Sequence, residues 1–177
     1  MLYGILGDIH SNYDALSAVL KDMKSIGVEE YCSVGDIVGY GAEPAICIDT
    51  LKNLNCLITA GNHDYAVAEK ISIDNFNIEA RESILWTRNN LSKEYLDFLS
   101  ALPLVVENDY FTVVHGTLHE PLKFLYMTNF NLAKISFKIL ETNLCFIGHT
   151  HTPMAFLYKH GKISYTTSKE IDINDAQ

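Results

Sequence analysis

The feature of this sequence that most constrains its fold is a repeated pattern, in which a short apolar segment ends in a cluster of polar residues. Segments that are apolar throughout are typical of strands buried on both faces of a parallel sheet. Ligands of such α/β sheets bind at the carboxyl ends of the strands. The pattern therefore predicts one site built from several strand ends, at Gly7-Asp8-Ile9-His10, Gly35-Asp36, Gly61-Asn62-His63-Asp64, His115-Gly116 and Gly148-His149-Thr150-His151.

Strand and helix signals alternate in the first part of the chain. Ser11 or Asn12 is a suitable N-cap for the first helix, and Pro44 suits the first position of the second. The expected strands are Leu2–Leu6, Tyr31–Val34 and Cys56–Ala60, and the expected helices are Tyr13–Ser25 and Pro44–Lys52.

Further helices and more antiparallel strands are expected in the second part. The helices are Asn75–Leu91, a shorter one capped by Ser92 that ends before Pro103, and Leu132–Leu140. The strands are Leu104–Glu107, Tyr110–Val114, Leu144–Ile147 and a hairpin of Met154–Tyr158 and Lys162–Thr166. Together the two parts predict an α/β fold.

Length and composition limit the function classes. A chain of 177 residues is typical of one domain, here residues 1–177. The net charge of −9 argues against a protein that grips the backbone of a long nucleic acid duplex, because that task needs clustered cations. No apolar run is long enough to span a bilayer, and the N-terminus lacks the features of a signal peptide. The four cysteines form no Cys-x-x-Cys pair, as expected of reduced core cysteines in a cytoplasmic protein.

The polar clusters have a composition that suits metal ions. Five of the seven histidines lie in them. Taken singly, each cluster has a structural explanation: Asp8 could cap a helix, Asn62 could form a turn, and His115 could be a hydrogen-bonded core histidine. Their combination instead indicates a site for a cation such as Mn²⁺, Fe²⁺ or Zn²⁺, because it joins carboxylate, imidazole and amide donors. The donors suffice for two ions, an arrangement used for displacement at phosphate esters.

With these motifs in order, the sequence resembles the calcineurin-like metallophosphoesterases, in particular their compact bacterial and archaeal phosphodiesterase-like branch. The family's blocks D-x-H, G-D, G-N-H-[DE], a strand ending in H, and G-H-[TS]-H all have counterparts. The stretch Ile37-Val38-Gly39-Tyr40-Gly41 is also similar to that branch, and the resemblance covers residues 2–165. It implies a two-sheet β-sandwich with helices on both outer faces.

The resemblance also implies a role for each site residue. Asp8, His10 and His151 would hold one metal ion, Asn62, His115 and His149 the second, and Asp36 would bridge both. His63 would bind no metal, but would stabilise the charge of the substrate phosphate or protonate the leaving oxygen. Asp64 would accept the other ring proton of His63 and favour its imidazolium form near neutral pH.

The implied function is hydrolysis of a phosphate diester by attack of a metal-bound hydroxide. Manganese is the preferred cofactor, with iron, zinc, nickel and cobalt as the other candidates, and the partner is a small phosphate ester. Two alternatives stay open: a phosphomonoesterase acting on a nucleotide or a phosphoprotein, and a non-catalytic interaction module with the same fold.

Weaker expectations concern residues around these motifs. Asn12 matches the family but also suits a helix cap, and Tyr40 would line the pocket or pack in a glycine-rich turn. The helices within Asn75–Ala101, with Arg81, Trp86 and Arg88, would overhang the site or cover the core.

The C-terminal region departs from the family pattern. Members of the resembled branch continue past the hairpin with further strands, which implies that the domain is incomplete and that its last strands are missing, with a naturally short member of the family as the alternative. One edge of the second sheet, built with the hairpin, would then be exposed. We therefore expect self-association around Ala155–Thr167, giving a homo-oligomer, or reduced stability. The tail Ser168–Gln177 is expected to be loosely held.

Overall fold

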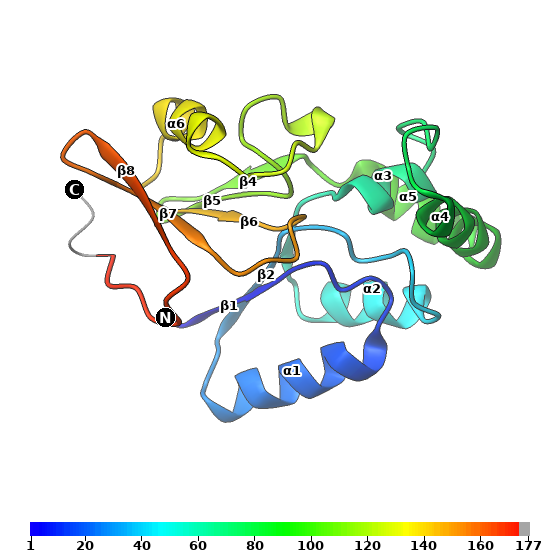
Figure 1. Ribbon diagram of the computed structural model, residues 1–177. Coiled ribbons are helices and arrows are strands. Elements are labelled where there is room, and N and C mark those ends of the chain that lie inside the picture. The colour runs from blue at the N-terminus through cyan, green and yellow to red at the C-terminus, as the bar shows by residue number, and fades with distance from the viewer. Residues whose placement is uncertain (174–177) are drawn as a thin grey trace.

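The computed structural model describes residues 1–173, so the end of the expected loose tail lies outside the described residues. Two three-stranded sheets lie between groups of helices, and a separate hairpin lies at one edge of the molecule (Figure 1). The strands are β1 (Tyr3–Leu6), β2 (Glu30–Ser33), β3 (Leu57–Ile58), β4 (Val105–Glu107), β5 (Thr112–Val114), β6 (Cys145–Ile147), β7 (Ala155–Lys159) and β8 (Lys162–Thr166). The helices are α1 (Tyr13–Ser25), α2 (Pro44–Asn53), α3 (Asn62–Val67), α4 (Ile78–Asn90), α5 (Lys93–Ala101), the 3₁₀ turn Pro121–Lys123 and α6 (Phe130–Ile139).

The two larger sheets form the sandwich expected from the sequence. The first has the order β1-β2-β3 and is parallel throughout. In the second, β5 pairs antiparallel with β4 and parallel with β6. An apolar layer joins the facing sheets, with Cys32 and Val34 from the first packed against Phe111 and Val113 from the second. Because β1, β2, β5 and β6 run the same way, their carboxyl ends lie at one end of the sandwich (Figure 1).

Helices cover the sandwich as the amphipathic patterns predict. Helices α1 and α2 lie on the side of the first sheet that faces away from the second, where Leu16, Ile48 and Leu51 are buried (Figure 1). Helix α6 packs on the hairpin, with 5.8 Å between the ring centroids of Phe130 and Phe156. The sheets and helices confirm the expected fold class. Among residues 1–173, no helix combines the length and the apolar character that a bilayer span requires.

Helices α3, α4 and α5 form a separate group beside the strand ends. Arg88 of α4 donates from Nη2 to the backbone oxygen of Ala66 at 2.6 Å and from Nε to that of Val67 at 3.1 Å. Its guanidinium also pairs with Glu69 at 2.9 Å. Arg88 therefore fastens α4 to α3, which identifies it as a structural residue.

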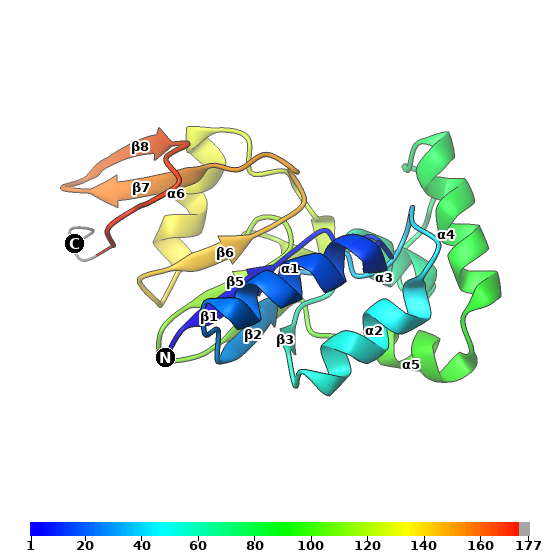
Figure 2. The ribbon, with the colours of Figure 1, turned by 90° about the horizontal axis from the view of Figure 1, so that it is seen from below.

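Two features differ from the sequence-based expectation. Helix α3 was not predicted, because the residues from Asn62 that read as a polar turn also begin a helix with Gly61 at its N-cap. The hairpin β7–β8 was expected in the second sheet but forms a two-stranded sheet of its own (Figure 2). Within it, His160 and Gly161 have φ values of 49° and 77°, the left-handed conformation of a tight two-residue turn.

Candidate metal centre

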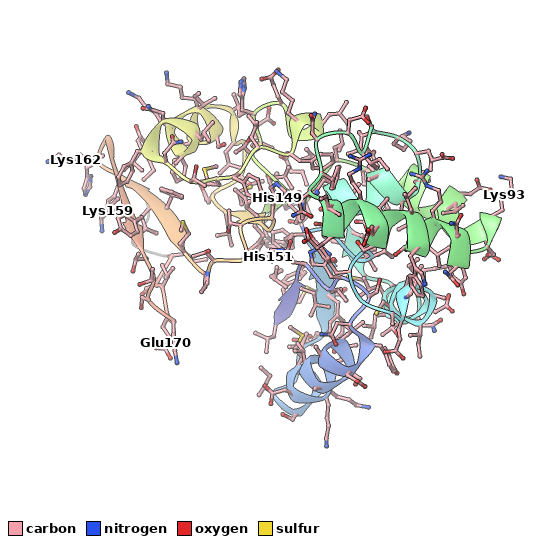
Figure 3. All side chains as sticks on the ribbon, turned by 45° about the vertical axis from the view of Figure 1, so that its right-hand side comes forward. Lys93, His149, His151, Lys159, Lys162 and Glu170 are labelled. Atoms are coloured by element: carbon pink, nitrogen blue, oxygen red, sulfur yellow. The ribbon has the colours of Figure 1, made fainter. Side chains whose placement is uncertain are left out.

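Each polar cluster follows a strand or begins the helix after it. Asp8 and His10 come after β1, Asp36 after β2, His115 directly after β5, and His149 and His151 after β6, while Asn62 and His63 open α3. Figure 3 shows His149 and His151 near the centre of the molecule, between the C-terminal elements and the helices α3 to α5. The structure therefore brings the seven sequence-predicted metal ligands together at one end of the sandwich.

The first group of donors consists of Asp8, His10 and His151. Their ligand atoms all lie within 4.8 Å of one another. His10 Nε2 is 3.3 Å from His151 Nε2, which in turn is 3.3 Å from Asp8 Oδ1. With this spacing the three side chains could hold one cation.

The second group surrounds the Nε2 atom of His115. It lies 3.0 Å from Asn62 Oδ1, 3.1 Å from His149 Nδ1 and 3.3 Å from Asp36 Oδ2. Asp36 Oδ2 is also 3.7 Å from His10 Nε2 in the first group. The Asp36 carboxylate therefore stands between the two groups, where a bridging ligand has to be.

The hydrogen bonds of the histidines show that the donor set fits cations. His115 Nδ1 lies 2.8 Å from the carbonyl oxygen of Val34, and His10 Nδ1 lies 3.1 Å from that of Val38. A carbonyl oxygen only accepts, so in each ring Nδ1 carries the proton, and Nε2 of the neutral ring presents a lone pair. These lone pairs converge on carboxylate and amide oxygens and on other ring nitrogens, an arrangement that a divalent cation satisfies.

The backbone at the site is held in an unusual conformation. Left-handed φ values near 50° to 70° occur at five of the seven donors: Asp8, His10, Asp36, His149 and His151. Residues other than glycine rarely adopt this conformation, and its strain persists only where the surrounding structure enforces it. Backbone hydrogen bonds provide this support, from Asp8 N to Gly35 O and from His10 N to Asp36 O at 3.1 and 3.0 Å.

Asp36 is the most enclosed carboxylate of the two groups, at 1% exposure. Its Oδ1 accepts the backbone N–H of His63 at 2.8 Å, and a Cβ at Gly61 would overlap the carboxylate. Burial raises the pKa of Asp36, but the nearby histidines, His115 first, lower it well below its usual range. Burial likewise lowers the pKa of His115, and Asp36 raises it to about 9. Asp36 and His115 therefore each favour the charged form of the other.

His63 lies beside the two groups, buried in an aromatic surrounding. Its ring centroid is 4.9 Å from that of His10, 4.7 Å from Tyr40 and 5.4 Å from Phe76. Gly39, with a φ of 92°, lies against the ring, and a Cβ there would overlap His63 Nδ1. This close contact between the backbone and the ring explains why glycine is needed at position 39.

The prediction that Asp64 accepts a ring proton of His63 is wrong. Asp64 Oδ1 accepts the N–H groups of Ile37 and Val38 at 2.9 and 3.2 Å, and Oδ2 accepts that of Gly61 at 2.9 Å. The physical reason is that Asp64 is the third residue of α3, so its carboxylate turns back to the start of the helix. His63 Nδ1 is buried and has no hydrogen-bond partner in the described part of the chain.

The expected charge of His63 changes with this correction. Burial lowers the pKa of His63 to about 4; Asp36 opposes this shift, and the neighbouring histidines add to it. Burial also raises the pKa of Asp64, to about 7, with Asp36 as the next cause. The protein alone therefore favours the neutral imidazole of His63 near neutral pH, and the expected imidazolium needs a further anion besides Asp36.

Some residues near the two groups of donors lie outside the sequence motifs. Asn12 caps α1 by accepting the N–H of Ala15 at 3.0 Å, which confirms the helix-cap reading. Tyr126 stacks on His149, with ring centroids 3.8 Å apart and an angle of 15° between the planes. Sequence reasoning missed Tyr126 and Phe76, because each lies in a loop with no strand-end motif near it.

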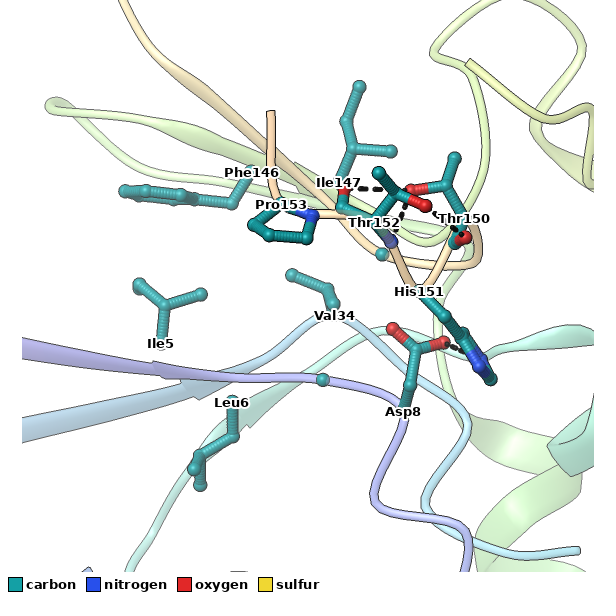
Figure 4. Close-up of a pocket in the computed structure, with 12 residues that line it drawn as sticks. Ile5, Leu6, Asp8, Val34, Phe146, Ile147, Thr150, His151, Thr152 and Pro153 are labelled. Atoms are coloured by element: carbon teal, nitrogen blue, oxygen red, sulfur yellow. Dashed lines mark hydrogen bonds and ion pairs between the residues drawn. The ribbon is translucent and has the colours of Figure 1, made fainter. Parts of the chain in front are cut away.

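A small groove reaches the first group from between the sheets. It has a volume of about 300 Å³ and lies between β1 and β6, lined by apolar side chains such as Ile5, Val34 and Phe146. Figure 4 shows Asp8 and His151 pointing toward one another at one end of this groove.

Comparison with known proteins agrees with this geometry. An uncharacterized protein of Methanocaldococcus jannaschii is 36% identical over 189 aligned positions, which cover 98% of this chain and 74% of the relative. The crystal structure of a metallophosphoesterase from Sphaerobacter thermophilus is 39% identical, with a TM-score of 0.74 over 86% of this chain and 61% of that one. A hypothetical protein from Pyrococcus horikoshii, at 18% identity and a TM-score of 0.69, shares the fold over 92% of this chain and 85% of its own.

These matches also show that the chain spans less than two thirds of the Sphaerobacter protein. The family model described as calcineurin-like phosphoesterase matches residues 1–162, almost the whole of the described structure. The matched family model, the shared fold and the relatives above show that this chain belongs to the calcineurin-like phosphoesterase family.

Proposed function

We propose that this chain is a metal-dependent phosphoesterase with a dinuclear centre, and that it hydrolyses phosphate diesters. The observation that carries the proposal is the position of the Asp36 carboxylate, 3.3 Å from His115 and 3.7 Å from His10, between two sets of converging donors. Family membership supports the same chemistry.

Each set of donors would hold one ion. Asp8, His10 and His151 would bind the first, and Asn62, His115 and His149 the second, with Asp36 shared. Two bound divalent ions would supply Lewis acidity to the phosphoryl group and lower the pKa of water. Manganese is the preferred ion, with iron, zinc, nickel and cobalt as the other candidates, since imidazole and carboxylate donors suit all of them.

His63 would act on the substrate rather than on a metal. A phosphate anion beside the ring raises the pKa of an imidazole, because the negative charge favours the protonated form. With a substrate bound, His63 would thus take up a proton from solvent and donate it to the leaving oxygen. The tight packing against Gly39 holds the ring in place for this transfer.

A pocket beside the first group of donors leaves room for an ester substituent. It has a volume of about 560 Å³ and adjoins Asp8, His10 and His151. Its presence supports a substrate with an organic group next to the phosphate, and we place diesters before monoesters because the resembled branch often cleaves diesters. We also propose a cytoplasmic location, because all four cysteines are free.

The test starts from protein stripped of metal with a chelator. Each candidate ion is then added back, and hydrolysis of bis(p-nitrophenyl) phosphate is compared with that of p-nitrophenyl phosphate. We expect no turnover without metal, and faster turnover of the diester with Mn²⁺. Faster turnover of the monoester would favour a phosphomonoesterase, and metal binding without any turnover would favour a non-catalytic module.

A further inference from the structure

The loop that precedes helix α6 lies against the second group of donors. Its Phe124 is 7% exposed and contacts His115, with 5.9 Å between the ring centroids. Directly after His115, a Cβ at Gly116 would lie 3.0 Å from the backbone of Phe124. Met127, further along the same loop, is buried as well, at 5% exposure. Two buried side chains therefore hold the loop in place, and Tyr126 lies between them beside the donors.

Tyr126 stacks on His149 from this position. The ring centroids are 3.8 Å apart and the planes differ by 15°, so the two rings are in van der Waals contact across their faces. Tilting the imidazole toward the tyrosine would make the rings overlap. The stack thus restricts the direction in which His149 Nδ1 points, which is toward His115 Nε2 at 3.1 Å.

The ring of His149 depends on this contact more than its backbone does. The N–H of His149 donates to Asp8 Oδ1 at 3.0 Å, which holds the backbone in its left-handed conformation but leaves the side chain free to turn. The chain then leads into the hairpin, and the side chain of His151 is 54% exposed. Apart from His115, itself a donor, Tyr126 is the aromatic ring that contacts His149 in the described part of the chain.

We propose that Tyr126 is a positioning residue of the second metal site, which orders the imidazole of His149 before the ion binds and thereby raises the affinity of this site. A donor that is ordered in advance loses less conformational freedom on binding. The proposal rests on the dinuclear centre of the proposed function, to which it adds a residue outside the motifs. Because the stack involves a ligand of the second group, the affinity of the first group should not depend on it.

Manganese binding by single-site variants tests this proposal without any substrate. In metal-stripped His151→Ala the first group lacks a ligand, so calorimetric titration with Mn²⁺ reports on the second ion. Adding Tyr126→Leu should weaken this binding by roughly 10–100-fold, the usual effect of losing a residue that orients a metal ligand. Tyr126→Phe keeps the stacked ring, so in the same background it should retain the original affinity.

The reciprocal background is His149→Ala, in which Mn²⁺ binding reports on the first group. Adding Tyr126→Leu should leave that affinity unchanged, because the stacking partner is already absent. Tyr110→Leu is the matched control in both backgrounds, since Tyr110 is 67% exposed and precedes β5, whose other end leads to His115. A general loss of structure would weaken binding in both backgrounds. An equal loss in both, no loss in either, or a loss that Tyr126→Phe shares would overturn the proposal.

Turnover of bis(p-nitrophenyl) phosphate separates metal positioning from a contact with substrate. At saturating Mn²⁺ the Tyr126→Leu protein should regain most of its kcat with an unchanged KM, because His149 itself is still present. A raised KM at saturating metal, with normal Mn²⁺ affinity, would mean that Tyr126 contacts the substrate, and the proposal would be wrong.

The same titrations distinguish failure of this proposal from failure of the proposed function. If the unmodified chain bound no Mn²⁺, the dinuclear centre would be refuted, and the role of Tyr126 with it. Binding of two ions with an unaltered affinity in Tyr126→Leu would refute the role of Tyr126 alone. Binding of two ions without turnover of any ester would refute the phosphoesterase function, while the effect of Tyr126→Leu on Mn²⁺ affinity would still support the positioning role.

Discussion

The parallel sheet β1–β2–β3 and the hairpin β7–β8 sit at opposite extremes of burial. After β2 and β3, residues 34–39 and 59–61 are buried, and Asp36 is 1% exposed. The hairpin has no fully buried residue, and His151, which precedes it, has a side chain that is 54% exposed. Figure 2 shows the hairpin at one end of the molecule and α4 and α5 at the other. One side of the candidate metal centre is therefore fixed by the core, whereas the other side depends on a lightly packed segment.

The largest expected effect tests the enclosed side. Asp36→Asn replaces the shared charge by a neutral amide, while the amide oxygen can still accept the N–H of His63. We expect loss of both ions and a fall in activity of roughly 10⁴-fold or more, since metal stabilisation contributes several kcal/mol. Metal analysis and turnover of bis(p-nitrophenyl) phosphate measure these changes.

The matched variant on the other side is His151→Ala. It removes a ligand of the first group alone, so the second ion should remain bound. If Asp36→Asn kept both ions, or His151→Ala lost both, the assignment of Asp36 as the bridge would be wrong.

A second effect concerns His63, which should act without holding a metal. His63→Ala should leave the metal content nearly unchanged and lower the rate by roughly 10²–10⁴-fold, the range for a lost general acid or base. The loss should be smaller for esters with good leaving groups, which need less protonation. Loss of an ion in this variant, with both retained in His115→Ala, would show that the two roles are exchanged.

Sequence reasoning was most successful where one local signal determines a position. The seven donors were placed because each follows an apolar strand, and α1 was placed from its periodicity and cap. The role of Asp64 was not predictable, because it depends on α3 beginning at the same residues and turning the carboxylate toward the helix start. Tyr126 and the separate hairpin depend on contacts between distant segments, on which local patterns carry no information.

A third, smaller effect is the pH dependence of stability in the metal-free protein. The pKa of His115 is about 9, so its contribution to stability is complete below its ordinary value near 6.5 and is lost as pH rises through 9. The pKa values of His63 and His149 are lowered to about 4, first by burial, so stability falls as the pH drops below 6.5. The raised pKa of Asp64, about 7, offsets part of this acid-side loss.

Thermal melting should therefore show a maximum near pH 6.5 for the metal-free protein. Manganese should remove the decline toward pH 9, because the cation takes the place of the proton on His115. A melting temperature that is constant from pH 6.5 to 9 without metal would contradict the assigned charge of this histidine. Since the titrating groups named here lie at the strand ends, the measurement reports on the enclosed side of the centre.

The smallest expected effect tests the hairpin. Its strands pair with each other and with no other strand among residues 1–173, and Tyr165 is 61% exposed on β8. Unpaired edges beside exposed aromatic rings favour pairing with a second copy, so we predict concentration-dependent self-association through the region around Ala155–Thr167. Tyr165→Lys should shift sedimentation toward the monomer, whereas Tyr110→Lys, equally exposed but outside the hairpin, should not. A monomer at every concentration, with an unchanged melting temperature in Tyr165→Lys, would mean that the packing of α6 on the hairpin suffices, and the contrast in burial would then have no consequence for assembly.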